Sequence, residues 1–242
     1  MILLTWNVEG GRATAGALEI SDQVAADVVF LQEGSVGHLW KGPICSAQVP
    51  GRSWGSAVLV RDGSLESISI PGYSGWVIGG CWRPKVPGIS EAIYLFSVHS
   101  PTANENEPRA GYVAESLQIV HAICAEVPSA APLVIGGDFN FTSFGERLPN
   151  ELPANDGSEL DALKQFRDLG LLVAWRDSHH GLPLPQTLRW KKAPATPYHC
   201  DGFLLRGVDV STIQCEVLSS GVVTRQSDHN PIVLWSGLGH AG

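Results

Sequence analysis

The sequence lacks the features that mark several classes of protein. Its five cysteines are odd in number and none forms a CxxC pair, which argues against a disulfide framework and favours reduced thiols in a cytoplasmic protein. No apolar run is long enough to span a membrane. The opening run ILLTW lacks the charged start and small-residue cleavage site of a signal peptide. We therefore expect a cytoplasmic protein with no membrane partner.

Positive charge is also scarce. Lysine and arginine total 16 against 24 acidic residues, so the formal net charge is −8. This balance argues against a protein that coats nucleic acid through bulk electrostatics, but leaves open an enzyme whose cations and metal are local to one cleft. No repeat or low-complexity linker divides the chain, and we predict one domain over residues 1–242, acting as a monomer.

Short apolar runs bounded by Gly, Pro, Asn and Asp recur along the chain, and several are apolar throughout, as expected of strands covered on both faces. The predicted strands are Ile2–Trp6, Val28–Leu31, Ala57–Val60, Trp76–Gly80, Ile93–Val98, Leu133–Ile135, Gly202–Leu205 and Ile232–Trp235. Helical spacing predicts helices over Ala15–Ala26, Arg109–Val127 and Glu159–Leu169. Many strands with few helices indicate an α+β sandwich of two packed sheets with helices outside.

Polar side chains stand at the ends of six of these apolar runs. They are Asn7, the pair Gln32 and Glu33, His99, the pair Asp138 and Asn140, Asp201, and the pair Asp228 and His229. Any one could be a turn former, since Asn and Asp bond their own backbone. Burying unpaired carboxylates is costly, however, so six such coincidences favour a shared site in which the acids hold a metal.

The ligand chemistry narrows the choice of metal. The candidate donors are mostly oxygen atoms, from Glu33, Asp138 and Asp228 with the amides of Asn7 and Asn140, and no cysteine cluster accompanies them. Such a set suits a hard cation, Mg²⁺ or Mn²⁺, better than structural zinc. Magnesium commonly shares its coordination sphere with substrate phosphate oxygens, which indicates phosphoryl chemistry.

Four motifs, in order along nearly the whole chain, carry a resemblance to a known family: TWNVEGGRA, VVFLQE, VIGGDFN and SDHNPIV. With them the chain resembles the endonuclease/exonuclease/phosphatase superfamily, whose members include DNase-I-like and AP-endonuclease-like enzymes. The resemblance implies a four-layer α/β/β/α sandwich and a divalent-metal phosphoesterase site at the ends of the sheets.

The resemblance also implies roles for the site residues. Asn7, Glu33 and Asp228 would hold or surround the metal. Asp138 would position or deprotonate the attacking water, and Asn140 would hold a phosphate oxygen. His229 would stabilise charge on the phosphate. Its partner would be Asp201 rather than its sequence neighbour Asp228, so that Asp201 fixes the tautomer and charge of the imidazole.

The substrate is less constrained. The segment FSVHSP, which contains His99, is closer to the DNase-I-like and sphingomyelinase-like members of the superfamily. His99 would then protonate a leaving oxygen or bind the phosphate. The alternative is a histidine that packs at the end of a strand. Candidate substrate contacts are Arg12, Arg109, Arg189 and Trp190, where Trp190 could instead be a core anchor.

Three functions remain open. The first is a Mg²⁺- or Mn²⁺-dependent nuclease, with DNA as the favoured substrate. The second is a phosphatase or phosphodiesterase for a small or lipid-derived phosphoester. The third is a non-catalytic binding module on the same fold, which is disfavoured because the site acids and His229 are all present.

Overall fold

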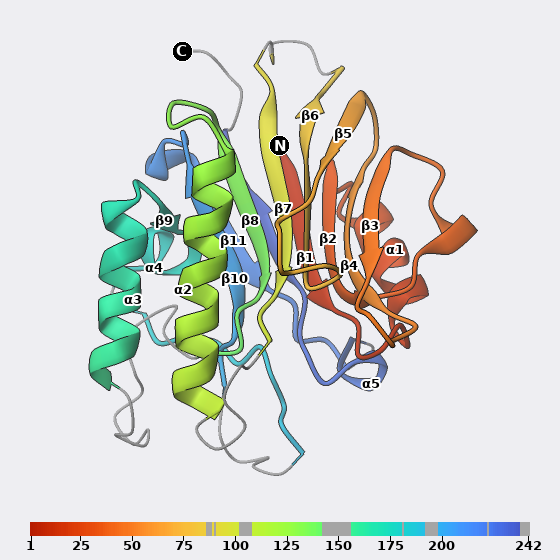
Figure 1. The fold of residues 1–242 in the computed structure, drawn as a ribbon. Coiled ribbons are helices and arrows are strands. Elements are labelled where there is room, and N and C mark those ends of the chain that lie inside the picture. Colours follow the sequence, from red (N-terminus) through yellow and green to blue (C-terminus); the bar gives the residue numbers. More distant parts are fainter. Residues whose placement is uncertain are drawn as a thin grey trace.

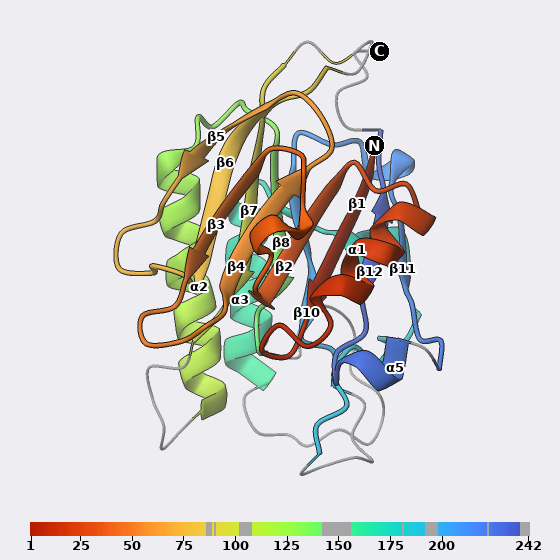
Figure 2. The ribbon, with the colours of Figure 1, turned by 90° about the vertical axis from the view of Figure 1, so that its right-hand side faces the viewer.

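The structure, a computed structural model, describes residues 1–85, 89, 91–101, 108–141, 156–180, 182–191, 198–221 and 223–237. Two six-stranded mixed sheets pack face to face, and the helices lie outside them (Figures 1 and 2). The first sheet has the order β11-β12-β1-β2-β4-β3 and the second β5-β6-β7-β8-β10-β9. This is the four-layer α/β/β/α sandwich that the sequence predicts.

The strands of the first sheet are β1 (Ile2–Asn7), β2 (Val28–Gly34), β3 (Ile44–Gln48), β4 (Gly55–Val60), β11 (Gln214–Val217) and β12 (Ile232–Trp235). Those of the second are β5 (Ser64–Ile68), β6 (Val77–Arg83), β7 (Ile93–His99), β8 (Leu133–Asp138), β9 (Leu172–Val173) and β10 (Asp201–Arg206). The helices are α1 (Thr14–Gln23), α2 (Pro108–Glu126), α3 (Asp156–Asp168), α4 (Ala174–Ser178) and α5 (Val223–Gln226), with 3₁₀ turns η1 (Gly37–Leu39) and η2 (Val210–Thr212).

Three apolar clusters hold the layers together. Between the sheets, Phe30 of β2 meets Phe203 of β10 edge to face, with ring centroids 5.8 Å apart. Residues of α1 pack on the outer face of the first sheet, and residues of α2 and α3 pack on the outer face of the second (Figure 1). Each sheet is therefore covered on both faces, which is why its central strands are apolar throughout.

The register of the strands gathers the polar ends at one rim of the sandwich. In the first sheet β1 runs parallel to β2, with Asn7 opposite Gln32. In the second, β7 runs parallel to β8 with His99 opposite Asp138, and antiparallel β10 begins with Asp201 opposite the same Asp138. Because parallel strands end on the same side, each sheet presents a row of polar residues to the other.

All eight predicted strands and all three predicted helices are confirmed, with boundaries shifted by a few residues. The strands that the sequence did not reveal are β3, β5, β9 and β11. These four lie at the sheet edges and are half exposed or very short, so they carry no long apolar run.

The five cysteines are free thiols, and four of them are buried. Over the described residues, no helix has both the length and the apolar character needed to cross a membrane.

Candidate active site

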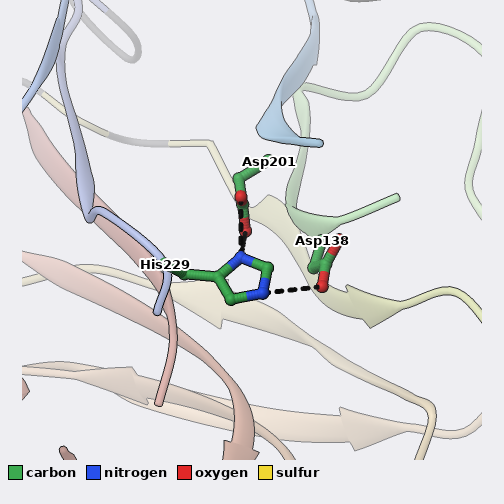
Figure 3. Close-up of side chains that lie close together, drawn as sticks. All are labelled: Asp138, Asp201 and His229. Atoms are coloured by element: carbon green, nitrogen blue, oxygen red, sulfur yellow. Dashed lines mark hydrogen bonds and ion pairs between the residues drawn. The ribbon is translucent and has the colours of Figure 1, made fainter. Parts of the chain in front are cut away.

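His229 lies between two carboxylates at the rim (Figure 3). Its Nδ1 is 2.9 Å from Oδ2 of Asp201, and its Nε2 is 3.7 Å from Oδ2 of Asp138. All three side chains are nearly inaccessible to solvent. The expected contact between His229 and Asp201 is confirmed, and the second ring nitrogen points toward Asp138.

The charge of His229 follows from this setting. Burial alone would lower the pKa of the imidazole, but the carboxylates of Asp201 and Asp138 outweigh it and raise the pKa to about 10. His199 is an internal comparison: it is equally buried, its Nδ1 faces the carbonyl of Pro185 at 2.7 Å, and burial lowers its pKa to about 4. His229 is therefore an imidazolium at neutral pH.

Asp138 is the carboxylate on which the site converges. Its oxygens accept hydrogen bonds from Nδ2 of Asn7 at 3.0 Å and from the backbone N–H of Asn140 at 2.9 Å. Burial and the charge of Asp201 raise the pKa of Asp138, while His229 and His99 act in the opposite direction. A carboxylate with a raised pKa is better suited to accept a proton at neutral pH.

Asn7 joins the two sheets at the rim. Its Nδ2 donates to Asp138 and also lies 3.3 Å from Oε1 of Glu33, whose other oxygen accepts from the backbone N–H of Gly10 at 2.9 Å. The hydroxyl of Ser227 donates to the carbonyl of Asn7 at 2.8 Å and accepts from the backbone N–H of His229 at 3.1 Å. The first and last sequence motifs are thus connected directly.

Backbone strain is concentrated at this rim. Four described non-glycine residues have positive φ, and three of them belong to the site: Glu9 (46°), Glu33 (55°) and Asn140 (56°). Side chains rarely adopt this left-handed conformation, which costs on the order of 1 kcal/mol or more per residue. At Glu33 and Asn140 it accompanies side chains that contact Asn7 and the carbonyl of Ser100 at the rim.

His99 faces the same carboxylates from β7. Its Nε2 is 3.8 Å from Oε1 of Glu33 and 3.9 Å from Oδ2 of Asp138. Burial lowers the pKa of His99, partly offset by Asp138, so the ring is neutral where His229 is charged. Among the described residues its buried Nδ1 has no hydrogen-bond partner. No described contact at Nδ1 therefore fixes the tautomer of the ring.

The charge balance of the rim fits a hard cation. Glu33, Asp138 and Asp201 bring three carboxylates together, and of the described groups that touch them only His229 carries positive charge. The Glu33 side chain is 24% exposed, which leaves it accessible to an ion. Oxygen donors with surplus negative charge suit Mg²⁺ or Mn²⁺.

The metal-ligand prediction for Asn7, Glu33 and Asp228 stays a prediction. Asp138, Asp201 and His229 also bring potential ligand atoms within 4.8 Å of one another. His229 is a poor ligand, however, because its Nδ1 is paired with Asp201 and its high pKa keeps the ring protonated. Asp228 is half-buried, and its carbonyl accepts from the backbone N–H of Arg189 at 2.8 Å.

Arg12, a predicted substrate contact, is paired with a rim residue that sequence reasoning missed. Glu9 is two positions after Asn7, and its Oε1 pairs with Arg12 at 2.9 Å and with Lys191 at 3.1 Å. Trp190, 44% exposed, meets Tyr198 edge to face at 5.9 Å, so it is not a core anchor. Arg109 is in the first turn of α2, but its side chain is outside the described part of the chain.

Arg189, also predicted to contact substrate, is bound to the loop that carries His229. Its guanidinium donates to Oδ1 of Asn230 and to the carbonyls of Ser227 at 2.5 Å and His229 at 3.3 Å. The neighbouring backbone pairs with the same loop, since the N–H of Asn230 donates to the carbonyl of Thr187 at 2.7 Å. The Thr187 hydroxyl accepts in turn from the backbone N–H of Asp201 at 3.3 Å. This segment therefore positions both members of the His229–Asp201 pair.

Replacing Arg189 tests this positioning role. We expect Arg189→Ala to lower kcat by about 10-fold or more with a smaller change in KM, because the loop that carries His229 would no longer hold the imidazole in a fixed orientation. Arg189→Lys should recover only part of the rate, since an ammonium group cannot reproduce the planar fork of donors. Steady-state kinetics with Lys191→Ala as the control would check this; a rise in KM alone would identify a substrate contact instead.

The sequence profile of the Endonuclease/Exonuclease/phosphatase family matches residues 4–229, which contain the whole rim. The chain belongs to this family. Membership supports hydrolysis of phosphoester bonds, and the family motifs coincide with the residues that the fold brings together. A search of the curated proteins found no match.

Solved structures share the fold of this Endonuclease/Exonuclease/phosphatase family member over nearly its whole length. The endonuclease domain of TRAS1, a telomere-specific non-LTR retrotransposon, is 16% identical with a TM-score of 0.67, and 98% of each chain is covered. An AP endonuclease from Archaeoglobus fulgidus is 18% identical with a TM-score of 0.71, covering 98% of this chain and 100% of that one. The AP endonuclease LMAP from Leishmania major is 13% identical with a TM-score of 0.69, at 97% and 87% coverage.

Proposed function

We propose that the protein is a divalent-metal-dependent nuclease that hydrolyses phosphodiester bonds, with DNA as its favoured substrate. The observation that carries the proposal is the placement of a charged His229, held by Asp201, opposite Asp138, which Asn7 joins to Glu33 at the same rim. An imidazolium and a carboxylate of raised pKa, 3.7 Å apart, can hold a phosphate and accept a proton from water in one small volume.

Each residue has a role that its contacts support. His229 presents a protonated Nε2 to a phosphate oxygen and stabilises the charge that grows there. Asp138 orients water through its carboxylate and accepts its proton. Asn140 keeps one amide hydrogen on the carbonyl of Ser100 at 3.0 Å and has a second for a phosphate oxygen. His99, whose pKa is lowered by burial, would face the same phosphate from β7.

Glu33, with Asn7 bonded to it and Asp228 as a further predicted ligand, would hold the metal. A bound Mg²⁺ or Mn²⁺ supplies Lewis-acid polarisation of a phosphate oxygen and offsets negative charge in the transition state. Asn7 bonds both Glu33 and Asp138, so it would keep the proposed metal ligand and the proposed base in a fixed relation. Metal removal with EDTA is expected to abolish activity.

A second candidate is hydrolysis of a small phosphoester. Two rim cations, Arg12 and Lys191, are paired with Glu9, and Arg189 is bound to its own loop, so these three offer little unpaired charge for a long polyanion. The net charge of −8 points the same way. A small ester would need only the phosphate-binding residues of the rim.

A substrate panel separates the two candidates. With Mg²⁺ or Mn²⁺, the purified protein would be assayed on plasmid DNA, abasic duplex, single-stranded DNA, RNA, inositol phosphates and a generic phosphodiester. We expect cleavage of DNA with kcat/KM well above that for small esters, and Asp138→Asn as the inactive control. Hydrolysis of small phosphates without any cleavage of nucleic acid would refute the nuclease proposal.

A further inference from the structure

Two tryptophans border the rim on the side of β7. The ring of Trp76 lies 5.1 Å from the ring of His99, and the ring of Trp54 lies 5.8 Å from it, measured between centroids. The two indole rings pack edge to face, with their centroids 5.7 Å apart and an angle of 81° between their planes. Together the two rings form a rigid corner. Trp54 is in the turn between β3 and β4, and Trp76 directly precedes β6.

This corner is accessible, unlike the tryptophans of the core. Trp6 and Trp82 are almost fully buried, whereas Trp54 and Trp76 are both partly exposed. Opposite Trp54 stands Gly10, where an added Cβ would come 3.8 Å from Cδ1 of the indole, so a side chain there would narrow the space beside the ring. The same Gly10 bonds Glu33, which places Trp54 beside the proposed metal ligand.

A cation and a cavity adjoin the two rings. The exposed Arg52 places its guanidinium carbon 5.8 Å from the centre of the Trp54 ring. Trp76 lines a cavity of about 380 Å³, whose other walls include Ile70, Pro71 and Ala47. Ligand cavities in proteins commonly have volumes of roughly 300–1,000 Å³ and mostly apolar linings, and this cavity adjoins Trp54 through the ring of Trp76.

The two partly exposed tryptophan rings offer a source of affinity for nucleic acid that does not depend on positive charge. An acidic enzyme whose nearby cations Arg12, Lys191 and Arg189 are engaged in pairs needs another source of affinity for nucleic acid. Stacking of bases on aromatic side chains supplies about 1–3 kcal/mol per base, and it does not depend on sequence because every base has a π face. Duplex bases are already stacked, so only an unpaired base can use it.

We propose that Trp54, Trp76 and Arg52 form a subsite that binds an unpaired nucleobase next to the phosphodiester being cleaved. The base stacks on Trp54 beside the cavity, and Arg52 contacts the adjoining phosphate. The substrate is therefore single-stranded or locally unpaired nucleic acid. The subsite rests on the proposed nuclease function and narrows it to this class of substrate.

The test compares two substrates of equal length: a single-stranded DNA oligonucleotide and an oligomer of base-free deoxyribose phosphates. For Trp54→Ala we expect kcat/KM on the oligonucleotide to fall by about 5- to 100-fold more than on the base-free oligomer. Trp54→Phe, which keeps an aromatic ring, should restore most of the difference. Arg52→Gln should weaken binding of the oligonucleotide, whereas the matched control Arg83→Gln, at the far end of β6, should not.

The outcomes separate the subsite from the nuclease function. Equal losses on the two substrates would mean that Trp54 only supports His99, and no loss on either would mean that it is not a contact; both results overturn the subsite alone. A wild-type protein that hydrolyses inositol phosphates and cleaves no nucleic acid would overturn the nuclease function and the subsite with it. Binding of the same oligonucleotide to Asp138→Asn, by fluorescence anisotropy, should show the Trp54 effect without turnover.

Discussion

Asp138→Asn is expected to lower kcat by at least 10²–10³-fold while the protein stays folded, the size of loss typical when a preorganised catalytic group is removed. The reason is that an amide cannot accept the proton of the attacking water. The side-chain oxygen that the substitution leaves in place can still accept from Asn140 or Asn7, so the local hydrogen bonds largely persist. Burial and Asp201 already raise the pKa of Asp138, so neutralising it also relieves the repulsion between two buried acids.

The measurement is kcat and KM on the preferred substrate, with the free energy of unfolding from urea denaturation. We expect that free energy to change by no more than about 1 kcal/mol. Asp168→Asn is a matched control, since Asp168 is exposed and pairs with Lys164 on the surface of α3. Near-wild-type turnover of Asp138→Asn would remove Asp138 from the proton transfer and reassign the base.

Much of the site could be predicted because its residues follow strands with a strong sequence signal. β1, β2, β7 and β8 are covered on both faces, so their apolar runs are easily found and the residue after each run is defined to within one or two positions. Asn7, Glu33, His99 and Asp138 were located in this way. The pairing of His229 with Asp201 could be expected from family resemblance, and the structure confirms the contact.

The remaining features depend on tertiary contacts that leave no periodic pattern. Arg189 stands in an irregular segment, and its partners, 38 to 41 positions away, are backbone carbonyls and an amide of the His229 loop. Backbone carbonyls occur in every sequence, so the sequence alone does not distinguish an arginine that binds them from an arginine that contacts substrate beside Trp190. Glu9 was overlooked for a similar reason: its positive φ and its two cationic partners appear only once the loops meet.

His229→Ala is the second change with a large expected effect, again at least 10²–10³-fold in kcat, because it removes the positive charge that faces the phosphate. It also leaves Asp201 and Asp138 buried without their shared cation. Loss of one partner from a buried pair costs about 3–5 kcal/mol, so the variant should be less stable at neutral pH than Asp138→Asn. Equal stability of the two variants would contradict the charge assigned to His229.

Asp201→Asn tests the charge of His229 while it keeps the histidine itself in place. In the wild type the raised pKa means that the stabilisation from the imidazolium is complete below the ordinary value of 6.5 and is lost as pH rises through about 10. Without the Asp201 carboxylate the pKa must fall, so the ring loses its proton at lower pH. We expect the alkaline limb of the kcat profile to move to lower pH and NMR titration of the His229 ring to follow it. If Asp201 only orients the ring, the rate would fall equally at every pH and the titration would stay near pH 10. Charge and orientation are thus distinguished by the shape of the profile rather than by the size of the loss.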